Sequence, residues 1–234
     1  MEAIPMQMTE KQVVAMIKTI IFDVDGTLLD TERIFMRAWR EAGAEFGYTV
    51  GQEVLLQTRA VNGATARARF AAACGEDFPF EAVRARRVEI GEQLIGEADA
   101  SQLLMPHAVQ TLKQLREKGY TLAVASSTGQ EKTVEHLEHA GLMEYFRVAV
   151  GGDMVERGKP EPDIFLLAAR LCDTQPQHCV VVGDTPADVL AATAAGMPVI
   201  LIPDQVPANE QTTALSRRVL SGLNQLADAL EAEE

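Results

Sequence analysis

Five short runs of apolar residues recur along the chain, and each has the length and composition of a buried β-strand. They are KTIIFDV (18–24), YTLAVAS (120–126), FRVAV (146–150), CVVVGD (179–184) and PVILIP (198–203). The runs are mostly continuous rather than alternating, which is typical of strands that are covered on both faces. The pattern therefore predicts a buried, largely parallel sheet.

Segments with helical periodicity alternate with these runs. They cover residues 108–118, 130–140, 163–172 and 186–195. Three of them end directly before a glycine, which is a common residue just past a helix end. Thr185 and Pro186 predict an N-cap and a first helical residue. Strands that alternate with helices indicate an α/β fold with helices on both faces of the sheet.

Residues 34–103 interrupt this alternation. The segment contains the helical patterns IFMRAWREAGAEFG and ATARARFAAACG but no strong strand pattern. A helical block of this size between the first two strands predicts an inserted α-helical cap domain. The core would then comprise residues 17–33 and 104–234, with residues 1–16 as a leader.

Composition and charge narrow the functional classes. The chain has 234 residues, of which 47% are hydrophobic and 24% charged, as in ordinary globular proteins. It has no apolar run near the roughly 20 residues that span a bilayer, and its first residues lack the apolar centre of a signal peptide. The net charge of −13 argues against a general nucleic-acid or anionic membrane surface, although a local pocket can still bind a small anion. Three cysteines without close pairing favour free thiols in a reducing, cytoplasmic setting.

Polar residues of a consistent kind follow four of the apolar runs. The first run ends in Asp23-Val24-Asp25-Gly26-Thr27 and the second in Ser126-Ser127-Thr128; Lys159 follows the third, and Asp184 and Asp188 follow the fourth. The carboxyl ends of parallel strands meet at one edge of the sheet, where binding sites gather. Because side chains alternate along a strand, Asp23 and Asp25 return to the same side, and Gly26 allows a sharp turn.

Four carboxylates in one crevice repel each other strongly unless cations balance them. A hard divalent cation with oxygen ligands resolves the repulsion, and Mg²⁺ commonly shares its coordination with a phosphate. Lys159 adds positive charge, while the Ser126 hydroxyl and the amides after Asp25 and Ser126 can donate to an anion. The pattern predicts a phosphate site in which one carboxylate attacks phosphorus and a second acts as general acid and base.

The segments DVDGTLLDTE, AVASST, GKPEPDIF and VVGDTPADVLAA resemble, in order, the four motifs of the haloacid dehalogenase superfamily. The likeness extends from about residue 18 to 203 and is closest to the β-phosphoglucomutase-like group, which includes hexose phosphate phosphatases. It implies a Rossmann-like three-layer α/β/α core with a helical cap. In that family the second core segment usually begins with Pro-Gly, whereas here it is Pro106-His107, which we interpret as a helix start.

The resemblance also implies roles for individual residues. Asp23 would be the nucleophile that becomes an aspartyl phosphate, and Asp25 the general acid and then base. The phosphoryl group would be held by Ser126, Ser127 and Lys159. Mg²⁺ would be bound by Asp23, the Asp25 carbonyl, Asp184 and, directly or through water, Asp188. An aspartate at position 25 favours phosphoryl chemistry over dehalogenation, because a departing halide needs no proton.

Two positions favour a phosphatase over a phosphomutase. The β-phosphoglucomutases carry a histidine where Phe35 stands here, and a rough match puts Gly63 in place of their cap arginine. Candidates for substrate recognition in the cap are Arg59, Asn62, Arg84 and Arg87. The alternative is that the cap arginines form a solvated helix face. We interpret the pair His136 and His139 as helix-surface residues rather than as metal ligands, since metal sites normally need three or four converging ligands.

The leading hypothesis is a Mg²⁺-dependent phosphatase of a small phosphorylated metabolite, for which a sugar phosphate is one candidate. Either a monomer or a homodimer is compatible with the sequence. A phosphomutase would differ by stable retention of phosphate on Asp23 and by dependence on a bisphosphate. A non-catalytic interaction protein is disfavoured because every motif residue is present. A response-regulator-like switch is disfavoured by Asp25 and by the helical insertion.

Overall fold

A computed structural model describes residues 17–58 and 63–231. The predicted leader and two of the cap candidates, Arg59 and Asn62, lie outside the described residues. Among those described, no helix combines the length and apolar character that crossing a membrane requires.

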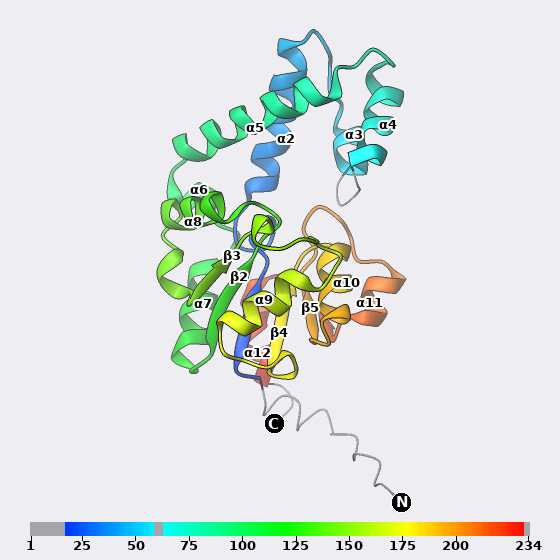
Figure 1. Cartoon of the computed structure of the whole chain (residues 1–234). Helices are drawn as coiled ribbons and strands as arrows, with labels where there is room; N and C mark the ends of the chain where they lie inside the picture. Colours follow the sequence, from blue (N-terminus) through cyan, green and yellow to red (C-terminus); the bar gives the residue numbers. More distant parts are fainter. Residues whose placement is uncertain (1–16, 59–62, 232–234) are drawn as a thin grey trace, which may run out of the picture.

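The core is built on a parallel sheet of six strands in the order β3-β2-β1-β4-β5-β6 (Figure 1). The strands are β1 (Thr19–Phe22), β2 (Thr121–Ala125), β3 (Val148–Val150), β4 (Cys179–Gly183), β5 (Val199–Leu201) and β6 (Arg218–Val219). The first five confirm the predicted strands, within slightly shorter bounds. The sixth was not predicted, because it has only two residues and both are exposed.

Helices cover both faces of this sheet, which makes the predicted three layers. They are α7 (Ala108–Glu117), α8 (Gln130–His139), α9 (Asp163–Leu171), α10 (Pro186–Ala194), α11 (Glu210–Leu215) and α12 (Leu226–Glu231). Side chains of β1 point alternately to the two faces of the sheet and so belong to two different apolar clusters. Ile20 and Phe22 join a cluster with residues of α7, α8 and α12, whereas Ile21 packs in a cluster with residues of α9 and α10.

The described part of the core also contains four short 3₁₀ helices in its connections. They are η1 (Met143–Tyr145), η2 (Gly152–Met154), η3 (Pro176–His178) and η4 (Leu223–Gln225). The predicted cap of α10 is confirmed, since Thr185 Oγ1 accepts from the Asp188 amide at 3.3 Å and Pro186 begins the helix.

The chain between β1 and β2 forms a separate helical unit (Figure 1). It contains α2 (Thr31–Glu45), α3 (Gln52–Gln57), α4 (Gly63–Cys74), α5 (Phe80–Glu97) and α6 (Ala100–Leu103). Its own apolar cluster includes Trp39 stacked on Phe70, with ring centroids 4.5 Å apart. This confirms a helical insertion between the first two strands, while its exact boundaries at residues 34 and 103 stay a prediction.

Helices α2 and α5 pack closely against each other at one glycine. A β-carbon on Gly91 would lie 2.2 Å from a ring carbon of Phe35. Any larger residue there would force the two helices apart, because no carbon contact is that short. Phe35 on α2 and Gly91 on α5 therefore set the spacing of the two helices.

Candidate active site

The turn after β1 fixes the first two aspartates. The Asp23 amide donates to the Val182 carbonyl at 2.8 Å and so keeps Asp23 in register with β4. Gly26 then turns the chain with φ of +88°, and a β-carbon on it would lie 2.6 Å from Asp184 Oδ2. A glycine is required here for both its left-handed backbone and its lack of a side chain. The turn therefore brings Asp184 directly against the first motif.

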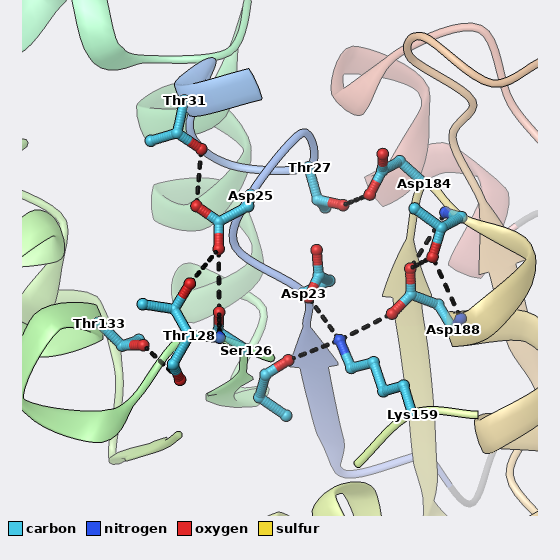
Figure 2. Close-up of polar contacts among 12 residues, drawn as sticks. Asp23, Asp25, Thr27, Thr31, Ser126, Thr128, Thr133, Lys159, Asp184 and Asp188 are labelled. Atoms are coloured by element: carbon cyan, nitrogen blue, oxygen red, sulfur yellow. Dashed lines mark hydrogen bonds and ion pairs between the residues drawn. The ribbon is translucent and has the colours of Figure 1, made fainter. Parts of the chain in front are cut away.

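Three hydroxyl groups hold Asp25 (Figure 2). Its Oδ1 accepts from Thr31 at 2.6 Å, and its Oδ2 accepts from Ser126 at 3.0 Å and from Thr128 at 3.1 Å. These donors come from the start of α2 and from the segment that follows β2. Asp25 thus joins the first motif to the second through hydrogen bonds to its carboxylate.

Lys159, in the third motif, contacts the aspartates Asp23 and Asp188 of the first and fourth motifs. Its side chain is only 5% exposed, and its ammonium group contacts Asp23 Oδ1, Asp188 Oδ1 at 2.7 Å and the Ala125 carbonyl at 2.9 Å. Hydrogen bonds to Asp23 and Ala125 use two of its three donors, and the ion pair with Asp188 adds a further favourable charge contact. The lysine neutralises charge at the floor of the site rather than extending into solvent.

Asp23, Asp184 and Asp188 form a buried acidic cluster in which one carboxylate oxygen of each lies within 4.8 Å of the others. Thr27 donates to Asp184 Oδ1 at 3.1 Å, but Asp184 Oδ2 is buried and has no hydrogen-bond partner among the described residues. Lys159 balances only part of three buried negative charges. The surplus charge, the unpartnered oxygen and the all-oxygen donor set fit a hard divalent cation.

The pKa values of these groups reflect the same crowding. Burial raises the pKa of Asp23 to about 8; Lys159 opposes this shift, whereas Asp188 and Asp25 add to it. Burial, with Asp23 and Asp188 nearby, also raises the pKa of Asp184 well above its usual value. Burial alone would lower the pKa of Lys159, but Asp188 and Asp23 raise it overall. The site is therefore electrostatically unfavourable until more positive charge enters it.

A cavity of about 760 Å³ lies above these groups, between the core and the cap. Core residues that line it include Asp23, Asp25, Lys159, Asp188 and the Ser127–Gly129 segment. The cap contributes Glu32, Phe35, Arg87, Val88 and Glu92. Ser127 is exposed to the cavity, whereas Ser126 is fully buried beside Asp25. The cavity therefore offers the aspartates to a ligand whose remaining atoms would contact the cap.

Among the described residues of the cap, Arg87 is the arginine that lines this cavity. Its guanidinium carbon lies 4.1 Å from the centroid of the Phe35 ring, and its Nε is buried without a hydrogen-bond partner among the described residues. Burial lowers the pKa of Arg87, while Glu32 opposes that shift. Arg87 also lines a second cavity of about 210 Å³ next to Trp39 and Thr185.

Other cap arginines form exposed ion pairs instead. Arg86 lies 2.6 Å from Glu45 and 2.8 Å from Glu89, Arg67 pairs with Glu81, and Arg84 lies 3.8 Å from Glu81. These three side chains are exposed and paired, as expected on a solvated helix face. Arg84 does not line either cavity, so the structure separates it from Arg87.

The structure brings all the predicted core residues together: Asp23, Asp25, Ser126, Ser127, Lys159, Asp184 and Asp188. Sequence reasoning missed Thr31 and Thr128 as partners of Asp25, although both stand within the recognised motifs. It also missed Glu92 and His136, whose side chains meet across 44 residues with Nε2 3.1 Å from Oε2. Neither residue belongs to a motif, and a single acid or histidine on a polar helix gives no signal of its own.

Known proteins resemble the chain over most of its length. Residues 17–196 match the profile of a family described as haloacid dehalogenase-like hydrolase. Hexitol phosphatase A of Escherichia coli K12 is 33% identical over 210 residues, covering 89% of this chain and 93% of that protein. A phosphoglycolate phosphatase of Escherichia coli O157:H7 is 32% identical over 201 residues, covering 78% and 79%.

Among solved structures, the phosphate complex of CbbY from Rhodobacter sphaeroides superposes with a TM-score of 0.75 at 31% identity, covering 92% of this chain and all of that one. This agreement extends over both the sheet and the helical insertion. The motif geometry, the acidic cluster and these likenesses lead to one conclusion. The chain belongs to the haloacid dehalogenase-like hydrolase family and is a phosphatase, a hydrolase of phosphoric monoesters, with β-phosphoglucomutase-like relatives and a helical cap.

Proposed function

We propose that the protein is a Mg²⁺-dependent phosphatase that hydrolyses a small phosphorylated metabolite, with sugar phosphates as the leading candidates, through a phosphoryl group on Asp23. The observation that carries this proposal is the arrangement at the end of β1. Asp23 faces the cavity beside Lys159, and Asp25 stands two residues further on in a cluster of hydroxyl groups.

In the first step, a carboxylate oxygen of Asp23 attacks phosphorus. The new bond from Asp23 to phosphorus forms as the bond from phosphorus to the leaving oxygen breaks. Protonated Asp25 gives its proton to that oxygen, so that an alcohol departs. Lys159, next to Asp23, offsets the negative charge of the phosphoryl group during transfer.

In the second step, Asp25 acts as a base. It takes a proton from a water molecule whose oxygen attacks phosphorus, and the bond from phosphorus to Asp23 breaks. Inorganic phosphate leaves, Asp23 is regenerated as a carboxylate, and Asp25 is protonated for the next turnover. The hydroxyl groups of Ser126, Thr128 and Thr31 hold Asp25 in place between these steps.

The residues that would hold Mg²⁺ are Asp23, Asp184, Asp188 and the carbonyl of Asp25. The unpartnered Asp184 oxygen and the surplus of buried carboxylates support this assignment. When bound, Mg²⁺ supplies positive charge to the oxygens of the phosphate. Lys159 also contacts Asp23 and Asp188, so its ammonium group would share these two carboxylates with the metal.

The cap would choose the leaving group. Its cavity-facing side chains combine an apolar ring, Phe35, with charged groups on either side, Arg87 and the two glutamates Glu32 and Glu92. Such a lining suits a polar, hydroxylated molecule. The relatives include both a hexitol phosphatase and a phosphoglycolate phosphatase at nearly equal identity, so likeness alone does not choose between sugars and acids.

The lining also supports a phosphatase over a phosphomutase. Phe35 stands where β-phosphoglucomutases carry a histidine, and its ring lies beneath Arg87. No histidine is among the described residues that line either cavity. An apolar ring cannot donate a hydrogen bond to a bisphosphate intermediate, which a phosphomutase must hold in its site.

The test is release of inorganic phosphate from a panel of phosphate esters, with Mg²⁺ and with chelator. The panel holds hexose, pentose and hexitol phosphates, phosphoglycolate, nucleoside monophosphates and β-glucose 1-phosphate. Metal-dependent release that is concentrated on a few related compounds is the expected result. Conversion of hexose 1-phosphate to 6-phosphate without release, or release that chelator leaves unchanged, would contradict the proposal.

A further inference from the structure

Helix α5 of the cap is tied to helix α8 of the core next to the substrate cavity. Glu92, near the end of α5, places Oε2 3.1 Å from His136 Nε2 and 3.4 Å from Lys132 Nζ. His139, one turn further along α8, lies with Nε2 2.8 Å from the carbonyl of Ala98, just past α5. The proposed mechanism uses none of these residues, yet α8 begins directly after the Ser127–Gly129 segment that lines the cavity.

The environment of Glu92 differs from that of an ordinary surface ion pair. The His136 side chain is only 4% exposed, while the Glu92 side chain remains 23% exposed and lines the cavity. One carboxylate oxygen is therefore fixed by a buried imidazole and an ammonium group. No hydrogen bond to the other oxygen, Oε1, is found among the described residues.

A carboxylate held in this way is a rigid hydrogen-bond acceptor. The imidazole of His136 and the ammonium group of Lys132 behind it fix Oε2 and so orient the carboxylate. Hydroxyl groups of a sugar or an alditol would donate to it. A second carboxylate or phosphate on the substrate would be repelled from the same place, because like charges at short range oppose each other.

We propose that Glu92 is a specificity-determining residue that accepts a hydrogen bond from a hydroxyl group of the leaving alcohol. His136 and Lys132 are positioning residues that act through Glu92. This inference rests on the proposed function, since it requires the scissile phosphate to sit at Asp23. It selects polyhydroxylated leaving groups over acidic ones among the esters that the cavity can hold.

The competing explanation is that Glu92 serves only to attach the cap to the core. The two explanations differ in their dependence on the substrate. A purely structural tie affects every phosphate ester alike, because cap attachment is common to all of them. A hydrogen bond to a hydroxyl group affects only esters that carry one.

The experiment compares Glu92→Ala with the wild-type protein on two substrates: the hexose or hexitol phosphate with the highest turnover, and p-nitrophenyl phosphate, whose leaving group has no further hydroxyl. We expect kcat/KM for the polyol ester to fall by about tenfold or more, mainly through KM, since a hydrogen bond to a charged group is lost. The value for the aryl ester should change by less than about twofold, because it makes no such bond.

Two further variants complete the design. His136→Gln should give the same substrate-selective rise in KM at smaller size, because Glu92 remains but is less well held. Glu89→Ala is the matched control: it lies on the same helix, is exposed, pairs with Arg86 and does not line the cavity. It should leave both substrates unchanged.

Equal losses on both substrates, or no loss on either, would overturn the role of Glu92. The proposed function is tested separately by wild-type turnover of p-nitrophenyl phosphate, which needs Asp23 but not Glu92. A wild-type protein that hydrolysed no ester would contradict the proposed function itself.

Discussion

Charged side chains at the strand ends of the core are buried and share several partners, whereas most of those on the cap helices face solvent in simple pairs. Lys159 is 5% exposed and contacts two carboxylates and a carbonyl. Arg86, on α5, is 38% exposed and pairs with two glutamates. Buried charges must be matched closely, because leaving one uncompensated is costly. Exposed pairs contribute little, about 0 to 1 kcal/mol.

This difference in burial suggests that the core carries out the chemistry and that the cap selects the substrate. Under the proposed function, the core offers one arrangement of charges that any phosphate ester would use. The cap offers a few side chains that reach the cavity, such as Arg87 and Glu92, among many that do not. Substitutions should therefore have large, substrate-independent effects in the core and smaller, substrate-dependent effects in the cap.

The largest effect is expected for Asp23→Asn. The amide matches the acid in shape but is a poor nucleophile, so turnover should fall by about 1,000-fold or more on every ester. The fold should persist, as circular dichroism would show. A variant that retained near-normal phosphate release would exclude Asp23 as the nucleophile.

Lys159→Met should come next, and it should affect both activity and stability. Loss of the ammonium group leaves Asp23 and Asp188 without their shared cation, which should lower the free energy of unfolding by about 3 kcal/mol in the absence of metal. Turnover should fall by about 100-fold, since the charge next to the phosphoryl group is lost. Urea unfolding and phosphate release measure the two effects.

Lys113→Met on α7 is the control for this lysine, because Lys113 is exposed, belongs to none of the four motifs and does not line the cavity. This control variant should change neither turnover nor the free energy of unfolding. Equal stability of the Lys159 variant and the wild-type protein would mean that the two carboxylates do not need this lysine.

The neighbours Arg87 and Arg86 test the cap most sharply. Arg87→Met should raise KM by about tenfold for the preferred substrate, because Arg87 faces the cavity over Phe35. Arg86→Met should change KM by less than about twofold and the free energy of unfolding by less than about 0.5 kcal/mol, as usual for a surface residue. Steady-state kinetics would measure KM for both variants. Similar KM values for the two would contradict a role for Arg87 in substrate binding.

The smallest effect is expected at His107, before α7. His107 adopts a left-handed backbone with φ of +67° and is exposed. Glycine adopts this conformation without a steric cost, so His107→Gly should stabilise the protein by about 1 kcal/mol. Thermal unfolding should show a higher midpoint with unchanged activity; a lower midpoint would mean that the imidazole makes a stabilising contact.

The core could be predicted from the sequence because its signals are local and repeated. Strands buried on both faces read as continuous apolar runs, and functional side chains follow them directly, as Asp23 and Asp184 do. The exceptions lack this signal: β6 has two exposed residues, and α11 and α12 have six residues each. Such short elements are stabilised by packing against the core rather than by a pattern of their own.

The cap could be predicted only as a set of helices. Arg86 and Arg87 are adjacent and chemically identical, and the structure alone places one in solvent and the other over Phe35. The contact between Glu92 and His136 joins two helices that are distant in sequence. His136, which we expected on a solvated helix face, is instead buried against the cap, because α5 covers it.

The central claim is that the phosphoryl group passes through Asp23, and trapping it there is the most direct test. The Asp25→Asn variant should still react with p-nitrophenyl phosphate, whose leaving group needs no proton, but should be unable to activate water. We predict a burst of about one p-nitrophenol per protein. Borohydride reduction followed by peptide mass spectrometry should then convert the side chain of Asp23 to that of homoserine. A wild-type protein that releases phosphate, together with a variant that shows no burst or a label on another residue, would contradict the account.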